Sequence, residues 1–302
     1  MKTDFSGLWP AIFTPIQKNG EPALDELGKL IELFIAQGLD GLYLLGSTGQ
    51  GVLFTEEQRK NVTALACEVN AGRIPLIVQV GALTTDESVR LARHAEQCGV
   101  DAISSVGPIY YAASTSMALE HYYTIATATD LPFFPYQLGD NSMKGETLSF
   151  VEKLLKIPNI TGMKLTTNQL LEISAIHNFA GDRLKLFSGS DELFCHASLC
   201  GTVGAIGSFY NIWGVPCKEV LTEFRKGNYQ LAKQFMLTFQ QVIQLVVPNA
   251  WTFFRKAMLL KYDIDLGATK APLGNTNTEW KDEEVIAICQ KIESFAASTI
   301  AI

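Results

Sequence analysis

The sequence predicts an α/β fold, a (β/α)8 TIM barrel followed by a C-terminal extension of three helices. Short apolar runs alternate with longer amphipathic stretches, as in a parallel sheet whose strands are joined by crossover helices. Eight such units fit within about 225 residues, which matches this barrel, whereas a doubly wound sheet rarely needs eight. The remaining residues have no strand signal. We therefore expect a catalytic barrel at residues 1–226 and a helical extension at 227–302.

Eight apolar runs of strand length define the expected barrel. They cover residues 9–15, 41–46, 75–81, 102–108, 132–137, 161–165, 184–188 and 203–208. The helix-period segments between them include residues 24–37, 56–69, 86–97, 147–156 and 169–178. Thr55 and Gln58 predict a capping box at the start of one helix. In the extension, a Gly, Pro and Asn-rich loop is expected near residues 267–277.

Composition limits the classes of partner. The 302 residues are 47% hydrophobic and 18% charged, which is enough apolar material for a large core. The net charge of -7 argues against a nucleic-acid partner, which needs a basic face. No apolar run approaches the roughly 18 residues of a membrane span, and the first ten residues lack a secretory apolar region. We expect a cytoplasmic protein with a small-molecule substrate.

Cysteine and histidine spacing predicts neither a metal site nor a disulfide framework. None of the six cysteines forms a C-x-x-C pair, and the four histidines are scattered, so buried reduced thiols are the better interpretation. The cysteines are Cys67, Cys98, Cys195, Cys200, Cys217 and Cys289. No metal or organic cofactor is expected.

Lys164 is the most informative residue in the chain. It lies near the end of an otherwise uncharged strand, where a barrel buries both faces. Burial disfavours the ammonium form, and a neutral amine is the nucleophile that a Schiff base with a ketone requires. The alternative is a lysine whose amine extends to solvent or pairs with an acid.

Tyr136 ends another apolar strand. A phenol there could move protons between a substrate and the lysine adduct. The alternative is a packed aromatic residue with a satisfied hydroxyl group.

Further polar groups follow four other strands. Gly-Ser-Thr-Gly at residues 46–49 predicts an anion-binding loop, in which Ser47 and Thr48 donate hydrogen bonds; a simple turn is the alternative. Asp191 and Glu192 could bind sugar hydroxyls or, alternatively, favour the dipole of the helix that they open. Ser208 and Tyr110 follow the eighth and fourth strands and are weaker signals when taken alone.

The combination of these motifs resembles the N-acetylneuraminate lyase and dihydrodipicolinate synthase family over nearly the whole chain. The motifs are Gly-Ser-Thr-Gly, Tyr-Tyr, Tyr, Gly-Met-Lys-x-Thr, Gly-x-Asp-Glu and Gly-Ser-x-Tyr-Asn, in that order. The resemblance implies that Lys164 is the Schiff-base lysine and Tyr136 the proton-shuttling tyrosine. Ser47 and Thr48 would bind the carboxylate of a 2-oxo acid. Tyr110 would complete a neighbour's site in a homotetramer built from dimers.

Within the family, the lyase branch is favoured by Ser47-Thr48, by Thr166, by the Asp191-Glu192 pair and by residues 207–211. The resemblance further implies that a polyhydroxyl tail is held by Gly189, Asp191, Glu192 and Ser208. Three departures from the family pattern are Gln50, Gln137 and the stretch at residues 137–142, which lacks the arginine that synthases place there for a dicarboxylic substrate.

The expected reaction is reversible aldol cleavage of N-acetylneuraminate to N-acetylmannosamine and pyruvate. A first alternative is another pyruvate-dependent aldolase or dehydratase of the family, acting on a different 2-keto sugar acid. A second is a non-catalytic sugar-acid sensor. The lysine and tyrosine argue against the sensor, since a sensor needs neither.

Overall fold

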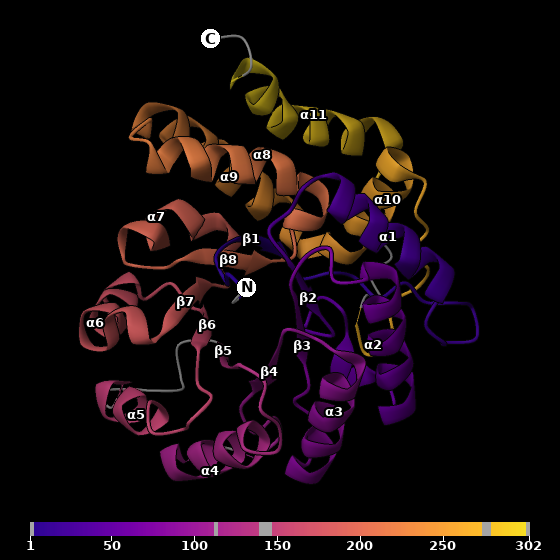
Figure 1. Cartoon of the computed structure of the whole chain (residues 1–302). Helices are drawn as coiled ribbons and strands as arrows, with labels where there is room; N and C mark the ends of the chain where they lie inside the picture. The colour runs from indigo at the N-terminus through magenta and orange to yellow at the C-terminus, as the bar shows by residue number, and fades with distance from the viewer. Residues whose placement is uncertain (1–2, 112–113, 139–146, 274–278, 300–302) are drawn as a thin grey trace.

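Eight parallel strands surround a common axis and alternate with helices, which confirms the predicted (β/α)8 barrel (Figure 1). The computed structural model describes residues 3–111, 114–138, 147–273 and 279–299. The strands are β1 (Gly7–Pro10), β2 (Leu42–Leu44), β3 (Leu76–Gln79), β4 (Ala102–Val106), β5 (Phe133–Leu138), β6 (Gly162–Thr166), β7 (Lys185–Ser188) and β8 (Gly204–Gly207). β1 pairs with β8, and a bridge from Ala11 to Tyr43 joins β1 to β2.

Helices cover the outside of this barrel. They are α1 (Leu24–Ala36), α2 (Glu56–Asn70), α3 (Thr85–Cys98), α4 (Thr115–Ala126), α5 (Thr147–Leu154), α6 (Leu170–Ala180), α7 (Phe194–Leu199) and α8 (Tyr210–Arg225). Short 3₁₀ turns are η1 (Gly51–Leu53), η2 (Gly181–Arg183), η3 (Asp191–Leu193) and η4 (Val247–Asn249). The capping box at Thr55 is confirmed, because its side chain accepts from the Gln58 amide and the Gln58 side chain accepts from the Thr55 amide.

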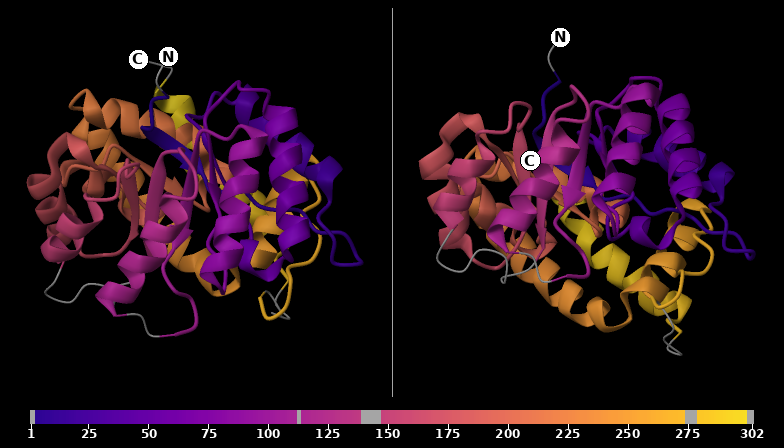
Figure 2. Two further views of the ribbon diagram at one scale, coloured as in Figure 1. Left: turned by 60° about the horizontal axis from the view of Figure 1, so that its bottom comes forward. Right: turned by 90° about the horizontal axis from the view of Figure 1, so that it is seen from below.

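The C-terminal helices α9 (Tyr229–Val246), α10 (Ala250–Tyr262) and α11 (Asp282–Thr299) gather on the α8 side of the barrel (Figures 1 and 2). Trp213 of α8 packs edge-on against Phe239 of α9 at 5.9 Å between ring centroids and also contacts Phe253 of α10. The extension therefore shares an aromatic core with the last barrel helix. The proposed boundary after residue 226 stays a prediction.

The expected first strand is wrong in its bounds. The sequence predicts a strand over residues 9–15, whereas β1 spans Gly7–Pro10. The apolar run continues because the residues after Pro10 leave the barrel wall and are buried by α8, α10 and the segment after α10. The Phe13 ring lies 5.2 Å from that of Phe254 of α10. The Phe13 amide donates to Oδ1 of Asn211, and the Ile16 amide donates to the carbonyl of Leu266. The other seven strands overlap their predicted ranges, with ends that shift by a few residues.

Two apolar clusters divide the interior. A large outer cluster lies between the strands and the helices. A smaller one, largely aromatic, includes Trp9, Tyr43, Phe134 and Phe187. In a barrel of this kind the strand interior is filled by side chains, and reactive groups lie at the carboxyl ends of the strands. The smaller cluster thus forms the floor beneath the candidate site.

Candidate active site

Lys164 lies on β6, directly beside Tyr136 of β5, because the two residues are Cα partners in the parallel ladder. Only 5% of Lys164 is exposed. Its Nζ lies 4.2 Å from the centroid of the Tyr136 ring and 4.7 Å from that of Tyr43. Within the described part of the chain, no carboxylate forms an ion pair with it. Aromatic faces, rather than an acid, therefore surround this amine.

Thr166 and Gly189 complete the surroundings of the tyrosine. Oγ1 of Thr166 donates to the Tyr136 hydroxyl oxygen at 3.3 Å. A Cβ atom at Gly189 would overlap the Thr166 hydroxyl and lie 3.1 Å from Cε of Lys164. Glycine at this position is required for the β7 loop to approach the lysine so closely. The structure thus brings together Lys164, Tyr136, Thr166 and Gly189.

The loop after β2 carries Ser47 and Thr48 and has a strained entry. Leu45 adopts a φ of 57°, which is uncommon for a residue with a Cβ atom. The side-chain amide of Gln79 donates to the Leu45 carbonyl at 3.3 Å and stabilises this turn. Thr48 is buried, and its hydroxyl lies 2.6 Å from that of Ser208, so the β2 and β8 loops are joined. Ser47 is exposed to the cavity described below.

Asp191 accepts a hydrogen bond from the beginning of α8, whereas the alternative interpretation has it favour the dipole of the helix that it opens. Its Oδ2 accepts from the Phe209 amide at 2.7 Å, and 6% of the residue is exposed. Burial raises the pKa of Asp191 to about 7, while the hydrogen bond from Phe209 opposes that rise. Glu192 is half-buried, and its backbone carbonyl accepts from the side chain of Gln240. The roles of both carboxylates in substrate binding stay predictions.

Asp191→Asn is expected to change how stability depends on pH. A carboxyl whose folded pKa is raised from 3.8 to about 7 stabilises the fold fully below pH 3.8 and loses that contribution as pH rises through 7. Asn cannot ionise and still accepts from Phe209. The free energy of unfolding of the variant, minus that of the wild type, should rise between about pH 4 and 7 by up to about 4 kcal/mol. Urea denaturation of both proteins at several pH values measures this difference. A difference that does not change with pH would contradict a raised pKa for Asp191.

A cavity of about 620 Å³ opens beside Tyr136, at the ends of β2 to β5. Its described lining contains no charged side chain; the polar groups include Ser47, Gln79, Tyr122 and Gln137. Tyr110 and Tyr111 lie at its edge, 80% and 73% exposed, with their rings edge-to-face at 5.2 Å. Of the predicted site residues, Ser47, Tyr110 and Tyr136 line this cavity. The others do not: Lys164, Thr48, Thr166, Gly189, Asp191, Glu192 and Ser208. The predicted tail-binding groups thus lie on the β7 and β8 side of Lys164.

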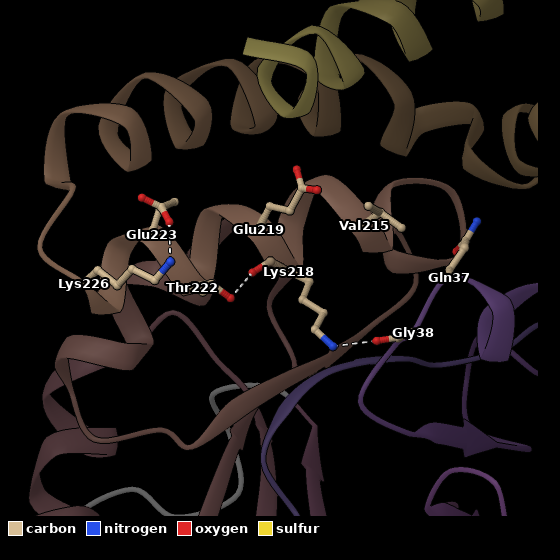
Figure 3. Close-up of a pocket in the computed structure, with 8 residues that line it drawn as sticks. All are labelled: Gln37, Gly38, Val215, Lys218, Glu219, Thr222, Glu223 and Lys226. Carbon is tan, nitrogen blue, oxygen red and sulfur yellow. Dashed lines mark hydrogen bonds and ion pairs between the residues drawn. The ribbon is translucent and has the colours of Figure 1, made fainter. Parts of the chain in front are cut away.

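A second cavity, of about 460 Å³, lies on the outer side of α8 near the end of α1 (Figure 3). Two of its lysines have partners, whereas Oε2 of Glu219 has no hydrogen-bond partner among the described residues. Lys226 pairs with Glu223 at 2.8 Å, and Lys218 donates to the Gly38 carbonyl at 2.5 Å. None of the predicted site residues lines it. The first cavity, beside Tyr136, is therefore the better candidate for the active site.

Two of the three departures from the family pattern have structural partners. Oε1 of Gln50 accepts from the Lys270 amide at 2.8 Å, which ties the β2 loop to the segment after α10. Nε2 of Gln137 donates to the Tyr122 hydroxyl at 3.1 Å. The third departure, the stretch at residues 137–142, lies outside the described residues from 139 onward.

The sequence prediction missed Tyr43, Gln79 and Tyr122. Tyr43 contacts the lysine, Gln79 supports the β2 loop, and the Tyr122 hydroxyl donates to the Tyr136 carbonyl at 3.4 Å. The sequence gives little indication of these three residues. Tyr43 and Gln79 are single polar or aromatic side chains within apolar strands, and Tyr122 lies in a helix of mixed composition.

The cysteines, candidate metal ligands and helix lengths bear on the expectations drawn from composition. All six cysteines are free; Cys195, Cys217 and Cys289 are buried and the other three partly so. The described residues contain no group of three or more His, Cys, Asp or Glu side chains placed to share a metal ion. Among the helices that the structure describes, none combines the length and apolar character needed to cross a membrane.

Comparisons with known proteins agree with this arrangement. A model of the dihydrodipicolinate synthetase family matches residues 4–291. An N-acetylneuraminate lyase of Escherichia coli is 32% identical over 287 residues, which are 94% of this chain and 96% of that protein. One from Citrobacter koseri is 33% identical over 248 residues, covering 82% of this chain and 83% of that protein. The solved sialic acid aldolase of Ruminococcus gnavus superposes with a TM-score of 0.90 at 25% identity, covering 97% and 99% of the two chains.

Proposed function

Because the chain belongs to the dihydrodipicolinate synthetase family, we propose that it is an N-acetylneuraminate lyase, a class I aldolase that cleaves N-acetylneuraminate to N-acetylmannosamine and pyruvate. The relatives named for this reaction support the substrate. One observation carries the chemistry: a buried lysine amine, free of carboxylate partners among the described residues, lies beside the tyrosine of the neighbouring strand.

The reaction begins when Nζ of Lys164 attacks the C2 ketone of the substrate. Loss of water then gives a protonated imine, or iminium, which is the electron sink for the next step. As the C3–C4 bond breaks, its electron pair moves toward the iminium nitrogen and an enamine of pyruvate forms. The C4 hydroxyl group loses its proton and becomes the aldehyde of N-acetylmannosamine. Protonation of the enamine at C3 and hydrolysis of the imine release pyruvate and the free lysine.

Tyr136 is the proposed acceptor of the C4 proton, either directly or through the substrate carboxylate. The hydrogen bond from Thr166 supports this role, because it fixes the position of the phenol oxygen. Ser47 and Thr48 would bind the substrate carboxylate. The bond between Thr48 and Ser208 supports that role by holding the β2 loop against the β8 loop.

Gly189, Asp191, Glu192 and Ser208 would bind the hydroxylated tail on the β7 and β8 side. For Asp191 this role competes with its hydrogen bond to Phe209. Tyr110, exposed at the edge of the cavity, would complete the site of a neighbouring subunit in a tetramer. We place the enzyme in the cytoplasm, without a metal or organic cofactor.

Incubation of the protein with a panel of 2-keto sugar acids tests the substrate. N-Acetylneuraminate should give equal amounts of pyruvate and N-acetylmannosamine, measured by chromatography. Cleavage of another acid in the panel, with N-acetylneuraminate untouched, would refute the substrate and leave the lysine chemistry in place. Binding of these acids without any cleavage would favour a sensor instead.

A further inference from the structure

We infer that Tyr43 is a positioning residue of the Schiff-base chemistry, and that the face of its ring holds Nζ of Lys164 and stabilises the iminium cation formed there. This inference rests on the proposed function, since it assigns a role within the same reaction. It concerns a residue that the sequence motifs did not identify.

The geometry places the lysine nitrogen between two aromatic rings. Nζ lies 4.7 Å from the centroid of Tyr43 and 4.2 Å from that of Tyr136. The two rings are 6.4 Å apart and nearly perpendicular, at 86°. Both distances are within the roughly 6 Å over which a cation is attracted to an aromatic face. The rings thus form an aromatic clamp around Nζ, defined by Tyr43 and Tyr136.

The Tyr43 ring is held rigidly in this orientation. It is fully buried in the interior cluster, and Gly46 leaves so little room beside it that a Cβ there would lie 2.6 Å from Cε1 of Tyr43. The hydroxyl donates to Oγ of Ser104 at 3.0 Å, and Ser104 donates to the Phe134 carbonyl at 2.6 Å. These contacts connect the ring to the β2 loop on one side and to β4 and β5 on the other.

The same contacts exclude the hydroxyl of Tyr43 from proton transfer. Burial raises the pKa of this phenol well above its ordinary value, although the bond to Ser104 opposes the rise. The hydroxyl proton is directed at Ser104 rather than at the lysine. Only the ring face of Tyr43 is therefore available to interact with the reacting amine.

A ring face matters here because the intermediate carries its positive charge at Nζ. No described carboxylate forms an ion pair with Lys164, and Asp191 interacts with it only at longer range, so it is the two ring faces that lie against the nitrogen that becomes the cation. A desolvated aromatic face attracts such a charge, and the buried ring of Tyr43 acts on the iminium without moving during the reaction. Tyr136 supplies a second face, but its hydroxyl is also needed for the proposed proton transfer. Tyr43 supplies the face alone.

The test measures the fraction of protein that holds pyruvate as an imine at equilibrium. Borohydride is added after equilibration at each pyruvate concentration and reduces the imine that is present. Tyr43→Phe keeps the ring and should stay within about threefold of the wild-type apparent constant for pyruvate. Tyr43→Leu removes the ring and should weaken that constant about tenfold, within the range of a desolvated cation–π contact. Phe34→Leu is the matched control, because Phe34 is equally buried but lies in the outer core. It should lower the melting temperature and leave the constant unchanged.

A second series of variants at position 43 keeps the inference testable if Tyr43→Leu does not fold. Phenylalanine with one, two or three ring fluorines at position 43 keeps the shape of the ring and progressively weakens its negative face. The pyruvate constant should weaken with each fluorine. A flat series, or Tyr43→Phe as impaired as Tyr43→Leu, would overturn the inference. Wild-type protein that traps no pyruvate at Lys164 would instead refute the proposed function.

Discussion

Lys164→Ala should abolish both the incorporation of a reduced pyruvyl group after borohydride treatment and the cleavage of N-acetylneuraminate. The amine is the only group in the proposed route that becomes covalently bonded to the substrate, so its loss removes the electron sink. Rate losses of several orders of magnitude are expected for a covalent nucleophile, on the order of 10⁴-fold or more. Peptide mapping of the trapped wild-type protein should locate the added mass at Lys164.

Lys164→Arg is the informative control for this prediction. Arginine keeps a positive charge between Tyr43 and Tyr136 but forms no Schiff base with pyruvate. It should therefore be as inactive as alanine while preserving the aromatic clamp. Labelling at a different lysine, or cleavage that survives in either variant, would contradict the mechanism.

Tyr136→Phe should lower turnover by roughly 10²-fold or more, which is typical of lost acid–base assistance. The ring is retained, so the cation–π contact with Lys164 at 4.2 Å should persist. Pyruvate trapping should consequently fall far less than cleavage. This separation between imine formation and bond cleavage is the signature expected of a proton shuttle.

Thr166→Val provides the comparison for Tyr136→Phe. It removes the hydroxyl that donates to Tyr136 at 3.3 Å and leaves the phenol in place. A loss smaller than that of Tyr136→Phe is expected, because the proton acceptor remains and only its orientation is relaxed. Near-normal turnover in Tyr136→Phe would mean that the hydroxyl has a structural role.

The barrel could be predicted from the sequence because its strands are buried on both faces and stand out as short apolar runs. Lys164 and Tyr136 were recognisable for the same reason, as reactive groups near the ends of such runs. In the structure the two residues are Cα partners on adjacent strands. This agrees with the prediction that they act together. Their catalytic roles stay predictions.

Tyr43 could not be predicted by the same argument. Its neighbours Leu42 and Leu44 face the outer core, whereas Tyr43 faces the interior cluster. When both faces of a strand are buried, the alternation between them leaves no polar pattern in the sequence. The bond from Phe209 to Asp191 was equally hidden, because it joins two loops 18 residues apart through a backbone amide. The end of β1 was misplaced since the apolar residues after it are buried by the extension rather than by strands.

The bond between Gln50 and the Lys270 amide has a consequence for synthesis of the chain. The two residues are 220 positions apart, so a ribosome makes the β2 loop long before the segment that holds it. The Ile16 amide likewise cannot form its hydrogen bond until the Leu266 carbonyl has been synthesised. Closing loops of this length costs entropy before it gains contacts, and folds rich in distant contacts form slowly. The loop carrying Ser47 and Thr48 therefore reaches its final hydrogen bonding only after Lys270 has been translated, which makes completion of this loop a late event in the maturation of each molecule.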